Sequence, residues 1–345
     1  MYRRIVLFMF SLVFTVMSMA QVMSAQEVSQ DSTINIIAYF CKNDTLEYVH
    51  HDYEARVNNN DTVVKHHLIE HFQLIVRDST SNGYEIESIP LKTEVYFGKD
   101  TLMTNITQGL MEKLGDMSTI FTTDEYGSIQ HIKNWKEIKN FSRTVIKAFC
   151  DSLYSACPHL DEMMPRARFE AQMSMQFTSE KTYIENSDDL QLLFSMYGRS
   201  IDIGKSESDD VDENGYPQHT IIIGGYGKVD QEYGFDDDFF LQAEIKTTIP
   251  KEDVKEHVKN TINMVVGDKS AGNINEDFDK MEYQDATVTS IEDYNYFYNG
   301  WPCEMEHTKI TDMMGIKTIE INKATWTYRA WGVFTGAAET ESVNL

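Results

Sequence analysis

The segment His67-Leu-Ile-Glu70-His71 has the spacing H-x-x-E-H, which is one of the zinc-peptidase patterns. That chemistry requires a helix, on which both histidines project from one face, one turn apart, with the glutamate beside them as the base. The apolar residues around the motif instead share one parity, as an amphipathic strand requires: Val64, Leu68, Phe72, Leu74 and Val76. On such a strand His67 and His71 lie on the wetter face and Glu70 on the other, so we predict no catalytic residues here. The neighbouring histidines predict only adventitious metal binding: His50, His51 and His66.

A second pattern, Asp210-Val-Asp212-Glu-Asn214-Gly215, matches the first half of a calcium-binding loop. Alternate side chains supply hard oxygen ligands, and the glycine permits a sharp turn. The twelfth position is Ile221, where a bidentate glutamate is expected, so another carboxylate has to complete the site. The sequence leaves two interpretations, a calcium site at Asp210, Asp212 and Asn214 or an acidic surface loop. It predicts no other cofactor.

Three tyrosines alternate along one expected strand, at Tyr294, Tyr296 and Tyr298, and Trp301 lies just beyond it. Exposed aromatic rings of this kind stack on sugar rings, whereas the same rings turned inward are ordinary core. Alternating aromatic residues are also what strands generally contain. Both interpretations of these four residues stay open, a ligand-binding face and a buried face.

The first residues and the overall charge indicate a compartment. Residues 1–25 combine Arg3 and Arg4, an apolar run and two small-residue sites that end at Ala20 and Ala25, which is the layout of a cleaved signal peptide. We therefore expect an exported protein, periplasmic, at the outer surface or secreted, in which four cysteines permit two disulfides. No later segment is apolar enough to span a bilayer. The net charge of −25 disfavours nucleic acid and anionic lipid headgroups as partners.

The hydrophobic pattern divides the rest of the chain into three parts. Residues 26–133 form a β-rich half, residues 134–197 carry most of the helix, and residues 198–345 return to strands with one helix near 250–266. We expect the two β-rich halves to form one continuous domain of the α+β class. Its predicted architecture is a large, curved, mainly antiparallel sheet with helices packed on one face.

Three local features refine this division. Asn134 and Glu137 fit a capping box at the start of the helical part. The stretch 200–217 is rich in Asp, Ser and Gly, and it is expected to be a loop. The helix expected after Pro250 has a proline at its start and Gly267 as its stop.

Two stretches carry a resemblance to known proteins. The run 122–134, which leads into a helix, and the turn Asn299-Gly-Trp-Pro302 resemble elements of exported, uncharacterised, β-rich proteins of gut-type Gram-negative bacteria. The order of the elements is also similar to that of the half-barrels of periplasmic lipoprotein carriers and lipid-binding proteins. This resemblance implies a fold and a compartment, and it carries no catalytic residue across.

Together these features favour an exported, non-catalytic binding or carrier protein of the cell envelope. Its ligand is expected to be apolar or a glycan, or its partner another envelope protein. The chain has no Walker loop, no G-x-G-x-x-G after a strand and no G-x-S-x-G, but dispersed catalytic carboxylates leave no local pattern. A hydrolase that uses such carboxylates and a structural or surface-assembly component are the alternatives.

Overall fold

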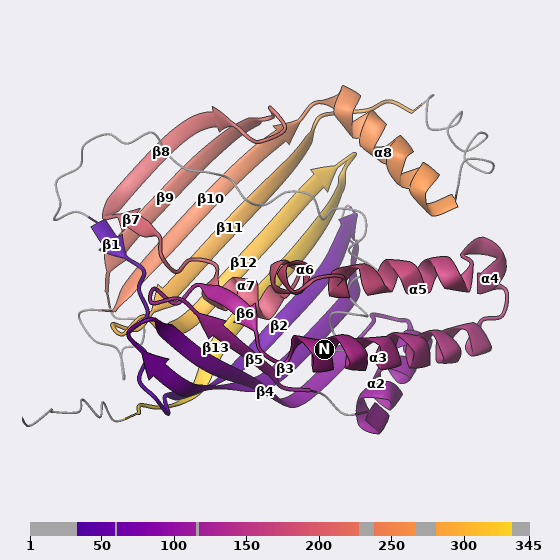
Figure 1. Ribbon diagram of the computed structural model, residues 1–345. Coiled ribbons are helices and arrows are strands. Elements are labelled where there is room, and N and C mark those ends of the chain that lie inside the picture. Colours follow the sequence, from indigo (N-terminus) through magenta and orange to yellow (C-terminus); the bar gives the residue numbers. More distant parts are fainter. Residues whose placement is uncertain (1–32, 59–60, 115–116, 228–237, 267–280, 333–345) are drawn as a thin grey trace, which may run out of the picture.

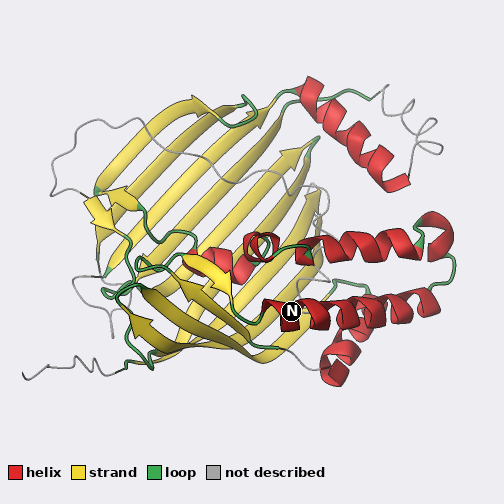
Figure 2. Ribbon diagram, viewed as in Figure 1, coloured by secondary structure: helices red, strands yellow, loops and turns green. Residues whose placement is uncertain are grey.

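The computed structural model describes residues 33–58, 61–114, 117–227, 238–266 and 281–332. The predicted signal peptide lies outside these residues. Within them, one large sheet forms the body of the molecule and the helices lie in front of it in the view of Figure 1 and Figure 2.

The large sheet has eleven described strands in the order β6-β5-β4-β3-β2-β13-β12-β11-β10-β9-β8, and β1 pairs with β7 in a second, two-stranded sheet. Every neighbouring pair in the large sheet is antiparallel. The prediction of a large, mainly antiparallel sheet is confirmed. The strands are β1 (Thr33–Asn35), β2 (Thr45–Asn58), β3 (Asp61–Thr80), β4 (Gly83–Tyr96), β5 (Thr119–Thr123), β6 (Ile129–Ile132), β7 (Ser200–Asp202), β8 (Gly204–Val211), β9 (Pro217–Tyr226), β10 (Phe239–Ile249), β11 (Ala286–Tyr296), β12 (Pro302–Met313) and β13 (Ile316–Ala330).

Two series of sequence-consecutive strands meet in the middle of this sheet. Strands β2 to β6 follow one another on one side, and β13 back to β8 follow one another on the other. The seam is the pair β2–β13, which is in register from Asn58 opposite Ile316 to Thr45 opposite Ala330, with an irregularity near Trp326. The first and last parts of the described chain are therefore neighbours in one hydrogen-bonded ladder.

A buried carboxylate ties three segments together at the end of this seam. Asp44 is 1% exposed, and its side chain accepts hydrogen bonds from the backbone N–H of Cys41 at 2.9 Å and of Gly332 at 2.7 Å. It also accepts one from Trp301 Nε1 at 3.0 Å. Because a buried charge needs such partners, Asp44 fixes the Trp301 turn against the start of β2.

The middle of the chain supplies most of the helices. Tyr154 of α3 packs on Phe169 of α5 with ring centroids 6.1 Å apart, and α7 contacts β12 and β13. The predicted late helix after Pro250 is confirmed as α8. The helical elements are α2 (Thr101–Leu114), α3 (Trp135–Ala156), α4 (Leu160–Met163), α5 (Arg166–Ser174), the short 3-10 helix η1 (Met175–Phe177), α6 (Glu180–Glu185), α7 (Asp188–Phe194) and α8 (Lys251–Val266).

We call inner the face of the large sheet that carries Phe72, Tyr48, Ala324, Met305, Tyr294 and Leu241, on β3, β2, β13, β12, β11 and β10 respectively. These residues belong to the main hydrophobic core, and they are all nearly fully buried. Aromatic residues of the helical part pack into the same core, Phe194 of α7 edge-on to Phe121 of β5. The side chains at the alternating positions of these strands point to the opposite face, which we call the outer face.

The start of α3 differs from the sequence expectation. Asn134 is the N-cap, but its side chain makes no capping hydrogen bond. Its Oδ1 accepts from the backbone N–H of Ile120 at 2.9 Å, and its Nδ2 donates to the carbonyl of Ser118 at 2.8 Å. The capping-box prediction is therefore wrong, because tertiary contacts to the β5 region occupy the side chain that the local pattern assigned to the helix end.

The stretch 200–217 also differs from its expectation as a loop. It forms β7, which pairs with β1, and β8, which is an edge strand of the large sheet. All residues of β8 are exposed, so they show none of the apolar alternation that marks a half-buried strand. All four cysteines lie in the described residues and are free thiols, so neither permitted disulfide is formed there.

Candidate functional site

The inner face is not uniformly apolar along its strands. Beyond the main core, toward α8, five strands turn polar in two adjacent rows, and a small second cluster of Ile249, Val254 and Ala286 then follows at the α8 end. We call the polar stretch the inner polar belt. Its members are Ser290 and Glu292 of β11, His307 and Lys309 of β12, Glu320 and Asn322 of β13, Asp52 and Glu54 of β2, and His66 of β3.

The belt residues pair with one another. His66 Nε2 lies 3.2 Å from Asp52 Oδ1, and His66 Nδ1 lies 3.5 Å from Glu54 Oε2. On the other side of the belt, Ser290 Oγ and His307 Nε2 are 2.8 Å apart. Such mutual pairing is what allows polar groups to sit on a face that is partly closed to water.

The surroundings shift the protonation equilibria of the belt. Burial alone would lower the pKa of His66, but its hydrogen bonds to Asp52 and Glu54 outweigh it and raise the pKa to about 9. Burial raises the pKa of Glu320, although Lys309 at 3.9 Å acts in the opposite direction. Burial also lowers the pKa of His307. His66 is therefore a cation at neutral pH, held between two carboxylates.

A separate cleft lies where β1 crosses the ends of β9 and β10. It has a volume of about 560 Å³. Phe239 and Ile34, which are 5% and 3% exposed, belong to its wall, whereas three tyrosines expose about half of their surface or more. The lining residues are Thr33, Ile34, Asn35, Ile37, Tyr39, Tyr226, Phe239 and Tyr298. We call this site the tyrosine cleft.

Backbone hydrogen bonds fix two of the three tyrosines. The N–H of Tyr298 donates to Asp238 Oδ1 at 2.8 Å, and Asp238 is fully buried. The N–H of Tyr39 donates to the carbonyl of Asn299 at 3.0 Å, so both tyrosines are tied to the turn that follows β11. Tyr226 pairs with Phe239 across β9 and β10. The rim of the cleft is thus positioned by ordered backbone.

Of the four aromatic residues that the sequence singled out, only Tyr298 reaches this cleft. Tyr296 and Trp301 are fully buried, and Tyr294 is 6% exposed. Tyr296 stacks on Phe239 at 4.9 Å, and Trp301 stacks on Phe40 at 3.8 Å. The buried interpretation therefore describes these three, because they continue the main core, while Tyr298 lies beyond the end of β11.

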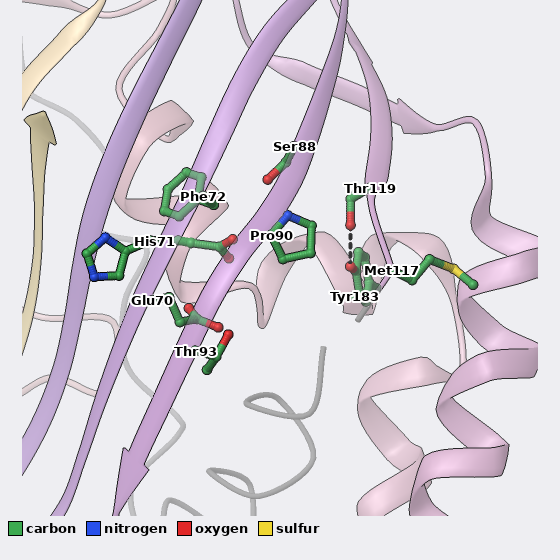
Figure 3. A pocket seen from close by; sticks show the side chains of 10 residues that line it. Glu70, His71, Phe72, Ser88, Pro90, Thr93, Met117, Thr119 and Tyr183 are labelled. Carbon is green, nitrogen blue, oxygen red and sulfur yellow. Dashed lines mark hydrogen bonds between the residues drawn. The ribbon is translucent and has the colours of Figure 1, made fainter. Parts of the chain in front are cut away.

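A small pocket on the inner face lies between β3, β4 and the helical part (Figure 3). Glu70 and Asp189 line it, and Thr119 and Tyr183 at its edge share a hydrogen bond of 3.1 Å. Its volume is about 40 Å³, which is room for one or two water molecules and too small for a sugar ring or a peptide. This pair of carboxylates therefore gives no support to a hydrolase.

The H-x-x-E-H segment lies on β3, and the strand prediction is confirmed. His67 and His71 lie on the outer face, opposite Tyr53 and Val49 of β2. Glu70 lies on the inner face, where its Oε2 is 3.6 Å from His50 Nδ1. The base and the two histidines of the peptidase pattern are therefore on opposite sides of the sheet.

The calcium-like pattern forms the turn between β8 and β9. Asp212 Oδ1 accepts hydrogen bonds from the backbone N–H groups of Asn214 and Tyr216, each at 2.9 Å, and Gly215 has φ +82°. Asp210 Oδ1 accepts from the N–H of Val211 at 2.8 Å. Turn chemistry alone thus explains the pattern. In the described part of the chain no group of three His, Cys, Asp or Glu side chains is arranged to hold a metal ion, and calcium stays a prediction.

Sequence reasoning missed two features of these sites. The belt joins residues from β2, β3, β11, β12 and β13, which only the strand order brings together. Tyr39 and Tyr226 come from opposite halves of the chain, and no spacing connects them to Tyr298. Tyr226 and Tyr298 lie at the ends of strand-like runs, but Tyr39 lies within one, so no common sequence signal marks the three.

Comparisons with known proteins give no family. No protein-family model matches the sequence, and no curated protein sequence matches it. A structural match is found to a solved structure titled "Lipid-protein interactions in lipovitellin", with a TM-score of 0.40 and 8% sequence identity. The match covers 85% of this chain and 26% of that one, so this chain spans about a quarter of the length of its structural neighbour.

Proposed function

We propose that this chain is a non-catalytic binding or carrier protein whose ligand occupies the tyrosine cleft. The observation that carries the proposal is the cleft itself, whose volume of about 560 Å³ lies within the range of roughly 300–1,000 Å³ typical of small-molecule sites. Four of its eight lining residues are aromatic and two are isoleucines, and no Asp, Glu, His, Lys, Arg or Cys is among the eight. This lining suits binding rather than catalysis.

The lining favours an apolar or amphipathic ligand. Ile34, Ile37 and Phe239 offer carbon surface, and a ligand that covers it removes that surface from water. Thr33 and Asn35 are the polar members at one side, and they can orient a polar end. Acidic side chains are absent from the lining, so the net charge of the chain does not fall within the cleft itself.

A glycan is the second candidate, and a separate observation favours it. The three tyrosines of the rim are 62%, 55% and 46% exposed, for Tyr39, Tyr226 and Tyr298 respectively. Tyrosine rings that expose a face and a hydroxyl group stack on sugar rings and bind their hydroxyl groups. The two candidates differ in which part of the cleft does the binding, the walls or the rim.

The experiment compares two probes on the full chain. The neutral apolar dye N-phenyl-1-naphthylamine reports an apolar site by fluorescence, and a panel of soluble oligosaccharides reports a glycan site by calorimetry. Phe239→Ala should weaken dye binding, whereas the Tyr226→Ala/Tyr298→Ala variant should weaken oligosaccharide binding. Tyr328→Ala, which removes a tyrosine that is 49% exposed on β13, is the matched control. Binding of neither probe by the folded chain would refute the proposal.

Export to the cell envelope is part of the same proposal. It rests on the layout of residues 1–25, and its test is the N-terminal residue of the protein recovered from its host. Cleavage after Ala20 or Ala25 should leave Gln21 or Gln26 first, and an intact Arg3-Arg4 end would contradict it. Among the described helices, none has the length and apolar character needed to cross a bilayer. Within this proposal we assign the chain to the α+β class, with its helices on the inner face of the sheet.

A further inference from the structure

One edge of β1 faces the tyrosine cleft. Among the described strands, β1 pairs with β7 alone, and the two lie side by side near the ends of β9 and β10 (Figure 1). Three consecutive residues of β1 line the cleft, Thr33, Ile34 and Asn35. Neighbouring side chains of a strand point to opposite faces. A cleft that all three residues line therefore runs along the edge of the strand, and not over one of its faces.

The hydrogen bonds of Ile36, which follows β1, show the direction of the backbone groups. The N–H of Ile36 donates to the carbonyl of Arg199 at 2.9 Å, and its carbonyl accepts from the N–H of Gly198 at 2.9 Å. Arg199 directly precedes β7, so the backbone groups of Ile36 point toward the β7 side. Because this direction alternates from one residue of an extended chain to the next, the N–H and C=O of Asn35 point away from β7.

The side of the chain that points away from β7 is closed at one end only. At Tyr39 it is closed, because the N–H of Tyr39 donates to the carbonyl of Asn299 at 3.0 Å. Asn35 is exposed, and its side chain accepts a hydrogen bond from Ser200 Oγ at 2.6 Å. Within the described part of the chain, no group is hydrogen-bonded to the backbone of Asn35 on this side. We call this side of β1 its free edge, and it presents an N–H and a C=O to the cleft.

An extended peptide matches this combination of a free edge and an aromatic cleft. A strand that adds to an open edge pairs its own backbone donors and acceptors with those of the edge, and its alternate side chains enter neighbouring pockets. Tyr226, Phe239 and Tyr298 offer aromatic surface for such side chains. A hydrocarbon or a sugar chain has no row of N–H and C=O groups at the spacing of a strand. The free edge therefore distinguishes a peptide from the other ligands that the walls and the rim would accept.

We propose that the tyrosine cleft binds an extended peptide segment of a partner protein, which adds as a strand to the free edge of β1. This inference rests on the proposed function, since it names the class of ligand that the cleft binds. The side chains that enter the cleft are uncharged, because no charged residue lines it. Basic residues at the ends of the segment suit the net charge of −25, which attracts cations over a longer distance.

Two synthetic peptides test the proposal by calorimetry on the full chain. The first alternates valine and threonine between two terminal lysines, and both of its termini are capped. The second has the same sequence with methyl groups on its central backbone nitrogens, which removes the donors that strand pairing requires. The wild-type chain should bind the first peptide at least tenfold more tightly than the second.

Two substitutions at one position separate backbone pairing from side-chain contacts. Asn35→Pro removes the N–H of the free edge but no hydrogen bond to β7, so the variant should fold, as circular dichroism checks. Its affinity for the first peptide should fall at least tenfold. Asn35→Ala is the matched control, because it keeps the backbone N–H, and it should bind within twofold of wild type. If the proline variant does not fold, the comparison of the two peptides on the wild-type chain decides.

Binding of N-phenyl-1-naphthylamine distinguishes failure of this inference from failure of the proposed function. If the dye binds but the first peptide does not, or if the two peptides bind equally, the cleft takes a ligand without strand pairing and the inference is overturned. Equal affinities of the two Asn35 variants would overturn it as well. If neither dye nor peptide binds, the proposed function fails with it. Self-association of the chain that Asn35→Pro abolishes would assign the free edge to a second copy and would also overturn the inference.

Discussion

At the scale of single residues, buried charged groups decide how the inner face is held. Asp44 and His66 illustrate two ways of stabilising such a group. The Asp44 carboxylate accepts three N–H donors, and the His66 ring lies between two carboxylates. Each arrangement compensates for the desolvation of the group that it holds.

The first prediction concerns the pH dependence that His66 brings. Its pKa is raised in the folded chain to about 9 from an ordinary value near 6.5. The folded state therefore holds a proton that the unfolded chain releases between these values. The stabilisation is complete below pH 6.5 and is lost as the pH rises through 9. The Tm of the wild-type chain should accordingly fall between pH 7 and 9.5.

The control for this prediction is His66→Gln, which has no proton to lose. Its Tm should start lower, because Asp52 and Glu54 then face each other without a cation, and it should change less over the same pH range. Glu320 and Lys309, which lie in the same cross-strand row as His66, are present in both chains, so their own contribution to the pH dependence of the Tm cancels in the comparison. Differential scanning calorimetry measures both dependences. If His66 were not the cause of the fall, the Tm of the two proteins would change with pH in parallel.

The sequence pattern predicted some of these side-chain positions correctly and others wrongly. The period-2 pattern around His67 correctly separated Glu70 from the two histidines, because alternation is a property of the strand itself. Asn134 and Asp212 are well-known capping and turn residues, yet Asn134 bonds to the β5 region while Asp212 shapes its own turn. A local pattern cannot tell which of these contacts a short polar side chain takes.

At the scale of elements, the exposed edge of the sheet shows why the loop expectation for 200–217 failed. β8 has solvent on both faces, so its residues need no apolar alternation and its sequence is Gly-Lys-Ser-Glu-Ser-Asp-Asp-Val. Charges on an edge strand discourage pairing with a second chain. On its outer-face positions, Lys205 Nζ lies 3.2 Å from Glu207 Oε2, and Asp209 Oδ1 lies 2.8 Å from His219 Nδ1.

The second prediction follows from this edge. Replacing Glu207 and Asp209 together by valine should produce concentration-dependent dimers or larger assemblies, because the open ladder of β8 then carries two hydrophobic side chains in place of two carboxylates. Light scattering coupled to size-exclusion chromatography measures the effect. Glu125→Val combined with Glu162→Val removes two exposed carboxylates away from the edge and should leave the chain as it was. Equal association of both double variants would mean that net charge, not the edge, keeps the chains apart.

The third prediction separates backbone strain from close packing in the turns. Gly300 and Gly215 have nearly the same φ, +83° and +82°, but different surroundings. A Cβ at Gly300 would lie 2.2 Å from the carbonyl oxygen of Ile37, whereas a Cβ at Gly215 would meet nothing within 4 Å. Gly215→Ala should thus cost only the strain of positive φ, about 1–2 kcal/mol.

Gly300→Ala should cost clearly more, at least about 3 kcal/mol in the free energy of unfolding, since the turn must move away from Ile37. It should also disturb Tyr197, whose hydroxyl donates to the Gly300 carbonyl at 2.6 Å. Urea denaturation of the two alanine variants gives the comparison directly. Similar losses in both would indicate that the turn after β11 shifts freely and that Ile37 does not restrain it.

At the scale of the whole molecule, the sequence predicted the kinds of element and not their neighbours. Strand-like runs before 134 and after 198 were visible, and so was the helical part between them. The order of the strands was not, because β2 and β13 are separated by more than two hundred residues and no local rule pairs them. The inner polar belt and the tyrosine cleft depend on that order, which is why neither was foreseen as a site.

The last prediction tests whether the two strand series form one cooperative unit, as the sequence led us to expect. Trp135 begins α3 and reports the helical part, whereas Trp326 lies on β13 at the seam. If the seam makes the series interdependent, tryptophan fluorescence from either reporter and far-ultraviolet circular dichroism should give the same urea midpoint. Because the chain also contains Trp301 and Trp331, each reporter's signal is obtained as the difference between the wild type and Trp135→Phe or Trp326→Phe. Thr325→Pro, placed where β13 pairs with Val49 of β2 and Glu304 of β12, should lower both midpoints together, because proline removes a ladder hydrogen bond from an interior strand. Two separate transitions, or a loss confined to the reporter on β13, would instead mean that each strand series holds its own fold and that the seam only joins them.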